Sequence, residues 1–148
     1  MATYSFQDVK MTLAGAGGVI ELGAGSGNAE EGITVEMSED QDVLTVGADG
    51  EFQHSLRPGK AGTVTVRLLY TSPKNALLQT LFLVQRASST MWGTNVITIR
   101  NKGNEELVGA RGAAFTRQPS VTYSKDGTFK EWVFNCGKID IKTGTYKE

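Results

Sequence analysis

The chain has 148 residues, and its 15 Lys and Arg against 16 Asp and Glu give a formal net charge of −1. This balance excludes the basic surface of a protein that grips nucleic acid, and no apolar run reaches the ~20 residues that a membrane helix needs. The length fits one domain (1–148), and 18 glycines with 3 prolines indicate tight turns between short strands. A single cysteine excludes an internal disulfide, and the first ten residues lack the basic and apolar regions of a signal peptide.

The first 32 residues predict two strands and a loop. Tyr4–Leu13 alternates apolar and polar residues, Gly15–Gly18 turns the chain, and Val19–Leu22 returns it as a short strand. The glycine-rich segment Gly23–Gly32 follows as a loop.

The segment Ile33–Leu69 alternates more regularly and predicts strands with one buried and one wet face. Ser38–Asp42 and Gly47–Gly50 are predicted turns or loops, and Arg57–Gly62 joins the last two strands. The buried face is expected to hold Ile33, Val35, Met37, Phe52, His54, Leu56, Val64, Val66 and Leu68. The wet face is poor in Lys and Arg, with Arg67 as the exception, expected at the rim or in a salt bridge. Such a surface suits something that must pass along it without being held.

One helix is predicted after this region. Ser72 is a natural N-cap, Pro73 fits the first helical position, and the apolar spacing continues to residue 88. The apolar stripe contains Leu77, Leu78, Leu81, Phe82 and Gln85. We expect Leu77, Leu81 and Phe82 to be buried against the sheet.

The rest of the chain returns to strands, so that the fold is mainly β with one helix. Leu107–Arg117 is expected to carry a bulge near Gly109–Gly112, and Asp-Gly within Ser124–Gly127 favours a hairpin. The other predicted elements are strands Val96–Arg100, Val121–Tyr123, Thr128–Phe134 and Ile139–Ile141, a turn at Asn101–Asn104, and a loose tail at 142–148.

Motifs for catalysis or metal binding are missing. His54 is the single histidine and is interpreted as a packed residue, and Cys136 as a small core residue. One His and one Cys cannot supply the usual zinc ligands within a subunit. The sequence therefore predicts no enzyme, no catalytic residues and no metal.

Two glycine motifs and one acidic cluster are interpreted as ordinary loops. Gly23, Gly25 and Gly27 are spaced by twos and lead into acidic residues, unlike a dinucleotide-binding fingerprint. Gly59-Lys60 is followed by Ala61 where a P-loop has Ser or Thr. The cluster Glu39, Asp40 and Asp42 lacks the EF-hand spacing and is expected to be solvated or to face a partner. No cofactor is predicted.

Several segments together carry a resemblance over essentially the whole chain, in order and length. The strongest are GADG at 47–50, RPGKAGTVTVRLL at 57–69 and TSPKNALL at 71–78. With MATYSFQDVKMTLAGAGG, SSTMWGTNVITIR and VTYSKDGTFKEWVF, they resemble the tail tube proteins of contractile-tailed bacteriophages. These features are architectural, so they specify a structural family and no reaction.

The resemblance implies a small β-sandwich or barrel with a helix at its flank, related in architecture to type VI secretion tube proteins. Subunits of this kind form hexameric rings that stack into a hollow tube, and their strands join into a shared inner barrel. The implied partners are further copies of the chain, a contractile sheath protein, baseplate and tail terminator proteins, and a tape measure protein in the lumen. DNA passes only in transit, without specific binding, and no membrane is involved. The implied location is the virion tail, assembled in the host cell cytoplasm.

Two residue sets follow as hypotheses. The lumen is expected to be lined by Thr34, Glu36, Gln53, Ser55, Thr63 and Thr65. The loop 39–50 is expected to contact neighbouring subunits or rings through its acids, with Arg57, Lys60 or Arg100 of the next copy as basic partners. The residues assigned to these contacts are Glu39, Asp40, Asp42, Asp49, Arg57 and Lys60. Lys125, Lys130 and Glu131 are assigned to an outward surface that meets the sheath.

Three alternatives stay open at this point. The chain could be the tube protein of a phage-derived bacteriocin or of a type VI secretion-like system. It could be a β-sandwich module that binds carbohydrate or a receptor, which predicts exposed aromatic residues on one face. A small hydrolase is disfavoured by the single histidine.

Overall fold

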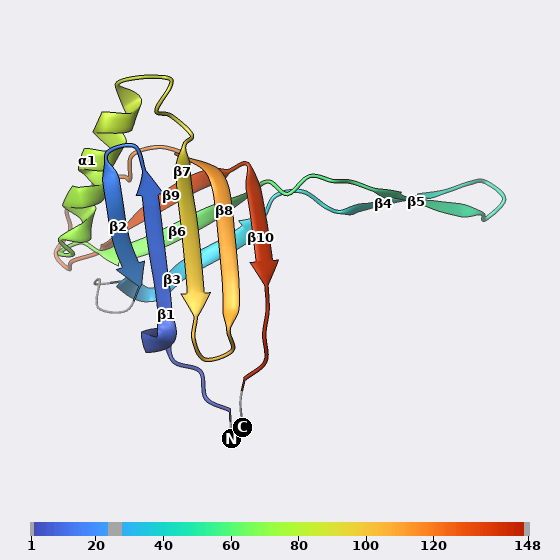
Figure 1. Cartoon of the computed structure of the whole chain (residues 1–148), viewed down its shortest axis with the longest axis horizontal. Helices are drawn as coiled ribbons and strands as arrows, with labels where there is room; N and C mark the ends of the chain where they lie inside the picture. The colour runs from blue at the N-terminus through green and yellow to red at the C-terminus, as the bar shows by residue number, and fades with distance from the viewer. Residues whose placement is uncertain (1, 24–27, 147–148) are drawn as a thin grey trace.

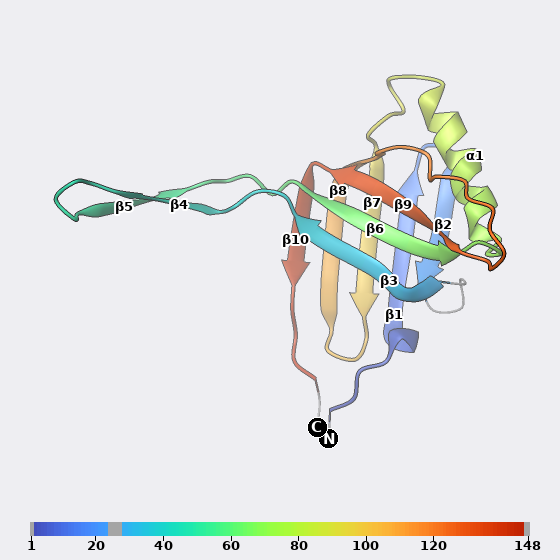
Figure 2. The same cartoon turned by 180° about the vertical axis from the view of Figure 1, so that it is seen from behind.

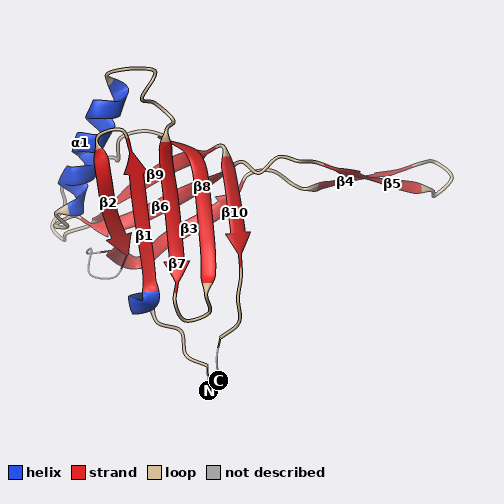
Figure 3. Cartoon of the chain, in the orientation of Figure 1, coloured by secondary structure: helices blue, strands red, loops and turns tan. Residues whose placement is uncertain are grey.

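The computed structural model describes residues 2–23 and 28–146, and it consists mainly of β-strands (Figures 1 and 3). The elements are η1 (Phe6–Asp8), β1 (Val9–Gly15), β2 (Gly18–Gly23), β3 (Asn28–Met37), β4 (Asp42–Val46), β5 (Phe52–Leu56), β6 (Gly62–Leu69), α1 (Lys74–Arg86), β7 (Asn95–Asn101), β8 (Glu106–Phe115), β9 (Phe129–Cys136) and β10 (Lys138–Lys142). No helix in the described part of the chain is both long and apolar enough to span a bilayer.

The strands form two packed layers. One layer contains β2, β1, β7, β8 and β10, and the other contains β9, β6 and β3, which cross behind it (Figures 1 and 2). All the strand pairs are antiparallel, as expected for a sheet that packs on one face and meets water on the other. In the described residues β2 and β3 lie at the two ends of the strand order and do not pair with each other, so the sheet is not closed within one subunit.

Strand β8 belongs to both layers. Leu107–Arg111 pairs with β10, whereas Ala114 and Phe115 pair with β9. Between these parts Gly112 has a φ of 63°, and the register with β7 shifts between Asn95 and Ile97. A glycine at positive φ accommodates such a bulge without Cβ strain. The predicted bulge is confirmed, and it is the point at which the chain changes sheets.

The core lies between the two layers and follows the alternation of the strands. On β6, Val64, Val66 and Leu68 are fully buried while the residues between them are not. Trp132 and Phe134 of β9 pack against Phe115, with ring centroids 5.8 and 4.7 Å away. The inward faces of the other layer contribute Met11, Leu13, Ile20, Leu22, Ile97, Ile99, Val108, Ala110 and Ile139.

Helix α1 lies beside β2 at one flank of the sandwich (Figure 1). Pro73 is its N-cap, and the Ser72 hydroxyl accepts a hydrogen bond from the Lys74 N–H at 3.4 Å, so the helix begins one residue later than predicted. Leu81 and Phe82 are buried as expected. Leu77 is 48% exposed, which corrects its assignment to the core. With 3.6 residues per turn, Leu77 lies beyond the edge of the stripe centred on Leu78 and Gln85.

Two buried polar contacts tie α1 to the strands. The Gln85 and Asn95 side chains exchange two hydrogen bonds of 2.5 and 2.8 Å, and Gln85 also donates to the Ala16 carbonyl at 3.2 Å. The Trp132 indole N–H donates to the Asn75 side-chain oxygen at 3.0 Å. Because each buried polar group has a partner, their burial carries no large desolvation penalty.

Strands β4 and β5 form a hairpin that projects from the sandwich, as Figures 1 and 2 show from both sides. Phe52 is 66% exposed and Leu56 85%, and His54 is exposed between them. The expectation that these three residues face a core is therefore wrong. The alternation does mark a strand, but β5 pairs only with β4 and both of its faces meet solvent.

Several boundaries also differ from those predicted. Val121–Tyr123 is not a strand, and no hairpin forms around Ser124–Gly127; the described segment between β8 and β9 is irregular. The first strand begins at Val9 after η1. The predicted loop 23–32 overlaps β3, which begins at Asn28, and its residues 24–27 lie outside the described part of the chain. Lys142 belongs to β10, and the looseness of the tail stays a prediction.

Candidate functional site

The outward face of β3, β6 and β9 is a polar surface with no helix over it in Figure 2. Thr34 pairs with Thr65, and Glu36 pairs with Thr63, so these four predicted residues share the face. We call this surface the outer sheet face; it also carries Arg67, Glu131, Val133 and Asn135 through the β6–β9 register. The residues between them point into the core, which fixes the orientation of the face.

The basic residue of this face is held by its neighbours. The Arg67 Nε lies 3.6 Å from a carboxylate oxygen of Glu131, and its guanidinium carbon lies 3.5 Å from the centroid of the Phe129 ring. Only 18% of the Arg67 side chain is exposed. The predicted salt bridge is confirmed, and the Phe129 contact is an addition that alternation alone does not indicate. The cation is thus partly screened from the solvent above the sheet.

Two of the predicted lumen residues lie elsewhere. Gln53 and Ser55 are on β5, where they pair with Thr45 and Val43 of the hairpin. They do not share the outer sheet face with Thr34 and the threonines of β6.

The hairpin carries Asp42 and Asp49, two of the four acidic residues that were assigned to contacts between subunits. Between residues 42 and 56 it has Asp42, Asp49 and Glu51 and no Lys or Arg. The Asp49 carboxylate accepts a hydrogen bond from the Glu51 N–H at 3.1 Å and so shapes the turn. His54 Nδ1 lies 2.9 Å from a carboxylate oxygen of Asp42 across the two strands, which links them in the exposed hairpin.

The base of the hairpin holds Glu39, Asp40 and Arg57. All three are exposed. The Gln41 side chain donates to the Gly59 carbonyl at 2.6 Å, and the Arg57 N–H donates to the Gln41 carbonyl at 2.8 Å. These bonds join the two arms where they leave the sandwich.

Lys60 binds an acid of its own chain. Its Nζ lies 2.9 Å from a carboxylate oxygen of Asp140 on β10, and Arg111 lies 3.5 Å from the other oxygen. The hydrogen bond from Lys60 is the main cause that lowers the pKa of Asp140. Sequence reasoning did not find this partner, because the two residues are 80 positions apart and no local pattern connects them.

The sheet that carries the outer face has unpaired edges at both sides. In the described chain β3 pairs with β6 alone. The second edge of β9 pairs with β8 only at Asn135 and Phe134, followed by a hydrogen bond from the Thr116 N–H to the Val133 carbonyl at 2.9 Å. A cavity of about 470 Å³ lies between residues 117–122 and the first half of β9. Unpaired edges are sites at which another strand can add.

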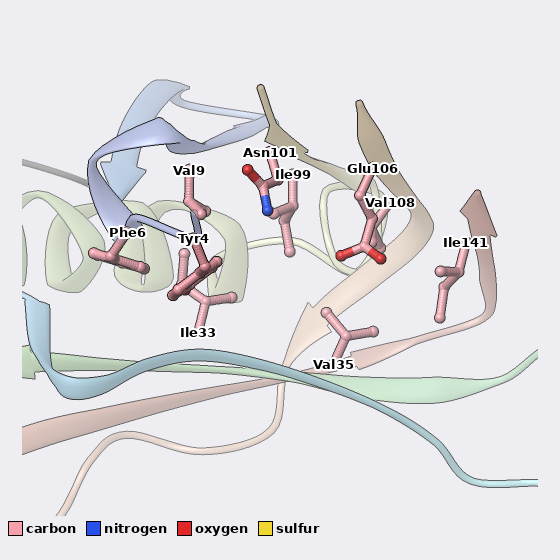
Figure 4. Close-up of a pocket in the computed structure, with 10 residues that line it drawn as sticks. All are labelled: Tyr4, Phe6, Val9, Ile33, Val35, Ile99, Asn101, Glu106, Val108 and Ile141. Carbon is pink, nitrogen blue, oxygen red and sulfur yellow. The ribbon is translucent and has the colours of Figure 1, made fainter. Parts of the chain in front are cut away.

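A second cavity of about 300 Å³ opens at the end of the sandwich between β3 and the ends of β7 and β8 (Figure 4). Ile33 and Val35 point into it from one layer and Ile99 and Val108 from the other, and the Tyr4 ring lies near Ile33. The polar groups at its rim are bonded to the C-terminal segment: Asn101 to Tyr146 at 3.3 Å, and Glu106 to Thr143 at 3.1 Å. This arrangement is typical of the open end of a β-sandwich core.

The described residues offer neither a reactive thiol nor a cluster of metal ligands. Cys136 is a buried core residue, as predicted, and burial raises the pKa of its thiol to about 11. A thiol with so high a pKa is a poor nucleophile at neutral pH. Among these residues no group of three or more His, Cys, Asp or Glu side chains is placed to hold a metal ion.

The most exposed aromatic side chains of the described residues come from different elements, and Trp92, which is 38% exposed, packs against Phe82 of α1. Phe52 is on the hairpin, Tyr4 is at the N-terminal segment, and Tyr123 lies between β8 and β9. Trp132 is buried. A carbohydrate-binding surface would gather such rings on one platform, so this arrangement does not favour the module that was considered as an alternative.

Solved structures with the same fold come from contractile injection systems. The match to a chain of the extended sheath–tube complex of the extracellular contractile injection system PVC has a TM-score of 0.57 at 13% identity, covering 90% of this chain and 88% of that one. The match to a chain of the PVC sheath/tube terminator has a TM-score of 0.55 at 14% identity and covers 89% of this chain and 92% of that one. The match to a chain of the anti-feeding prophage baseplate has a TM-score of 0.52 at 12% identity and covers 96% of this chain and 97% of that one. At these identities the likeness shows the fold.

The sequence itself identifies the family. A search of curated proteins finds no significant match. The model of the bacteriophage PhiTE tail tube protein family, in contrast, matches residues 1–144. This span contains both layers of the sandwich, the hairpin and α1. The chain therefore belongs to the bacteriophage PhiTE tail tube protein family and is a structural subunit of a tail tube.

Proposed function

We propose that copies of this chain form hexameric rings that stack into a hollow tube, with the outer sheet face lining the lumen. The observation that carries this proposal is a polar, uncovered face bounded by the unpaired edge of β3 and by the first half of β9, whose second edge has no partner strand in the described chain. A face of this kind is wet in the single subunit and becomes a channel wall when the sheet continues from copy to copy.

The edges give a route to closure. The free edge of β3 in one copy would pair with the first half of β9 in the next, which is free on its second side, and this pairing would extend the three-stranded sheet around the ring. Continuous pairing removes the exposed backbone groups that otherwise promote uncontrolled association. Thr34 and Glu36 lie on β3, so each would stand beside the junction and repeat in every copy.

The chemistry of this face suits a conduit for DNA. Protein–DNA affinity rises with each phosphate that Lys or Arg neutralises, and a cation on this face would recur in every ring. Thr34, Thr63 and Thr65 present small hydroxyls, and Glu36 a carboxylate. Arg67 is paired with Glu131. DNA would pass during ejection without specific binding.

The hairpin supports contacts between copies. Its apolar residues Leu44, Val46 and Phe52 are each more than half exposed, with accessible fractions of 55%, 60% and 66%. Exposed apolar side chains on a projecting element mark an interaction surface. The hairpin of one copy would bury them against its neighbour, and its acids would contribute electrostatic specificity there.

Further partners follow from the fold and family. The solved relatives are named as sheath–tube, terminator and baseplate components, which supports a tube that lies inside a contractile sheath, starts at a baseplate and ends at a terminator. A tape measure protein would occupy the lumen during assembly. The tube would be part of the virion tail and assemble in the host cell cytoplasm, with no enzymatic step of its own.

Negative-stain electron microscopy of the concentrated, purified protein tests the proposal. We expect rings or hollow tubes, and a reconstruction should show β3 of one copy hydrogen-bonded to β9 of the next. Particles that remain monomeric at every concentration and with an added baseplate fraction would contradict it.

A phage-derived injection system is the second candidate, because the solved relatives come from such machines. The neighbouring genes distinguish the two. Capsid and packaging genes beside this one indicate a virion, and their absence next to intact sheath and baseplate genes indicates an injection system.

A further inference from the structure

Strand β6 connects two exposed surfaces at opposite ends of the subunit. Its first residue, Gly62, follows the hairpin arm, and its last residue, Leu69, precedes Tyr70. Eight residues of strand span roughly 26 Å. Figures 1 and 2 both show the hairpin leaving one side of the sandwich and the β6–α1 junction at the other.

The far end carries an aromatic and basic group, which we call the tyrosine–lysine surface: Tyr70, Tyr123 and Lys130, together with Lys125, which follows Tyr123 by two residues in the chain. The Tyr70 and Tyr123 ring centroids are 6.2 Å apart in an edge-to-face arrangement, and the Lys130 Nζ lies 5.1 Å from the Tyr70 ring centroid. Tyr123 is 86% exposed although it is held by Tyr70. Such a preorganised tyrosine offers contact area at a low entropic cost.

The composition of the hairpin complements this surface. Residues 42–56 supply three carboxylates and no Lys or Arg. Lys125 and Lys130 supply two cations, beside the exposed Asp126 and the Arg67–Glu131 pair. The exposed apolar residues of the hairpin would meet Tyr123 and Val121, which is 59% exposed.

We propose that the hairpin of one copy docks on the tyrosine–lysine surface of a second copy in the adjacent ring. The hairpin and this surface lie at opposite ends of one subunit, so the contact is head-to-tail between copies. A heterologous contact of this kind does not close on itself and extends along an axis. This inference rests on the proposed tube function and assigns the contact between adjacent rings. Lys125 and Lys130 are thereby assigned to this contact and no longer to the sheath.

Charge reversal with rescue tests the pairing. Asp49→Lys with Glu51→Lys, and separately Lys125→Glu with Lys130→Glu, should each raise the concentration needed for tube growth at least about ten-fold. In an equimolar mixture, every contact between one variant and the other joins opposite charges, so assembly should recover, as it should in the four-fold variant. Lys10→Glu, on an exposed position of β1, is the matched control and should assemble normally. Circular dichroism checks that each variant is folded.

A cysteine pair measures the contact directly. In tubes of the Ala48→Cys, Thr122→Cys variant, oxidation should produce a ladder of covalent oligomers, because Ala48 is in the hairpin turn and Thr122 adjoins Tyr123. Each variant that carries only one of the two introduced cysteines should give no ladder, because the native Cys136 is buried. Normal tubes without a ladder, and with no effect of charge reversal, would overturn this inference and leave the proposed function standing. Failure of the unmodified protein to form rings or tubes would overturn the proposed function and this inference with it.

Discussion

Leu77 and Leu81 lie one turn apart on α1 and differ sharply in burial, 48% against 3% exposed. Replacing Leu81 with Ala should lower the free energy of unfolding by about 2–5 kcal/mol, because it leaves a cavity between α1 and the sheet. Leu77→Ala is the matched control and should change the free energy of unfolding by about 0.5 kcal/mol or less. Urea denaturation of the dilute monomer measures both.

Equal effects of the two substitutions would contradict the orientation of α1. The comparison is sharp because residue type and helix are the same and only the direction of the side chain differs. It also separates the observed packing from the sequence interpretation, which placed Leu77 in the core.

Cys136 should make the protein less stable at alkaline pH. Burial raises the pKa of the folded thiol from 9.0 to about 11. Between these pH values the folded chain keeps a proton that the unfolded chain has lost, so the free energy of unfolding falls as the pH rises. Below pH 9 this contribution is fully present.

Thermal unfolding between pH 8 and pH 11 measures this effect, with Cys136→Ala as the control. The alanine variant should lose less stability over the same range. In the unmodified protein a thiol reagent should react slowly at pH 8 until denaturant is added. Rapid labelling of the native protein would contradict the burial of this side chain.

At the scale of elements, alternation predicted most of the strands correctly. Val64, Val66 and Leu68 are buried because period-2 alternation and a covering layer coincide at β6. The bulge in β8 was also predictable, since glycines cluster where the strand changes sheets. Thr34 and Thr65 share a face for the same reason, so part of the candidate site could be inferred from sequence.

The hairpin shows the limit of this reasoning. Alternation in Phe52–Leu56 reports a strand, but it carries no information on what lies over its apolar face. In the described subunit nothing covers it, and the apolar side chains are consistent with burial between copies. Partners distant in sequence, such as Asp140 for Lys60, were likewise beyond local patterns.

The hairpin should be dispensable for folding and necessary for assembly. Its strands pair with each other, apart from the sandwich core, so replacing residues 42–56 with a short Gly-Ser turn removes little buried surface. We expect a thermal midpoint within a few degrees of the unmodified protein, and no tubes by sedimentation and electron microscopy. A shortened chain that still forms normal tubes would contradict the assigned role of the hairpin.

At the scale of the whole molecule, the subunit has features that are completed only by other copies. In the proposed tube, the free edge of β3 and the first half of β9 would extend the sheet around a ring, and the hairpin would extend along the axis. Because these two directions use different surfaces, ring formation and ring stacking should be separable by mutation. A variant without the hairpin should still form rings, whereas a variant with blocked strand edges should form neither rings nor tubes. The proposal thus assigns both repeat directions of a tube to surfaces of one chain.

Glu36→Lys tests the lumen directly. In a hexameric ring, six copies that each change from −1 to +1 add roughly 12 unit charges at one level of the channel, and DNA phosphates bind to clustered cations. We expect normal tubes, but a reduced rate or yield of DNA delivery by phage that carry the variant. Glu36→Gln removes the carboxylate without adding a cation and should deliver DNA nearly normally. Glu21→Lys makes the same charge change on an exposed position of β2 in the other layer and should have little effect. Unchanged delivery by assembled Glu36→Lys particles would show that this face does not line the path of the genome.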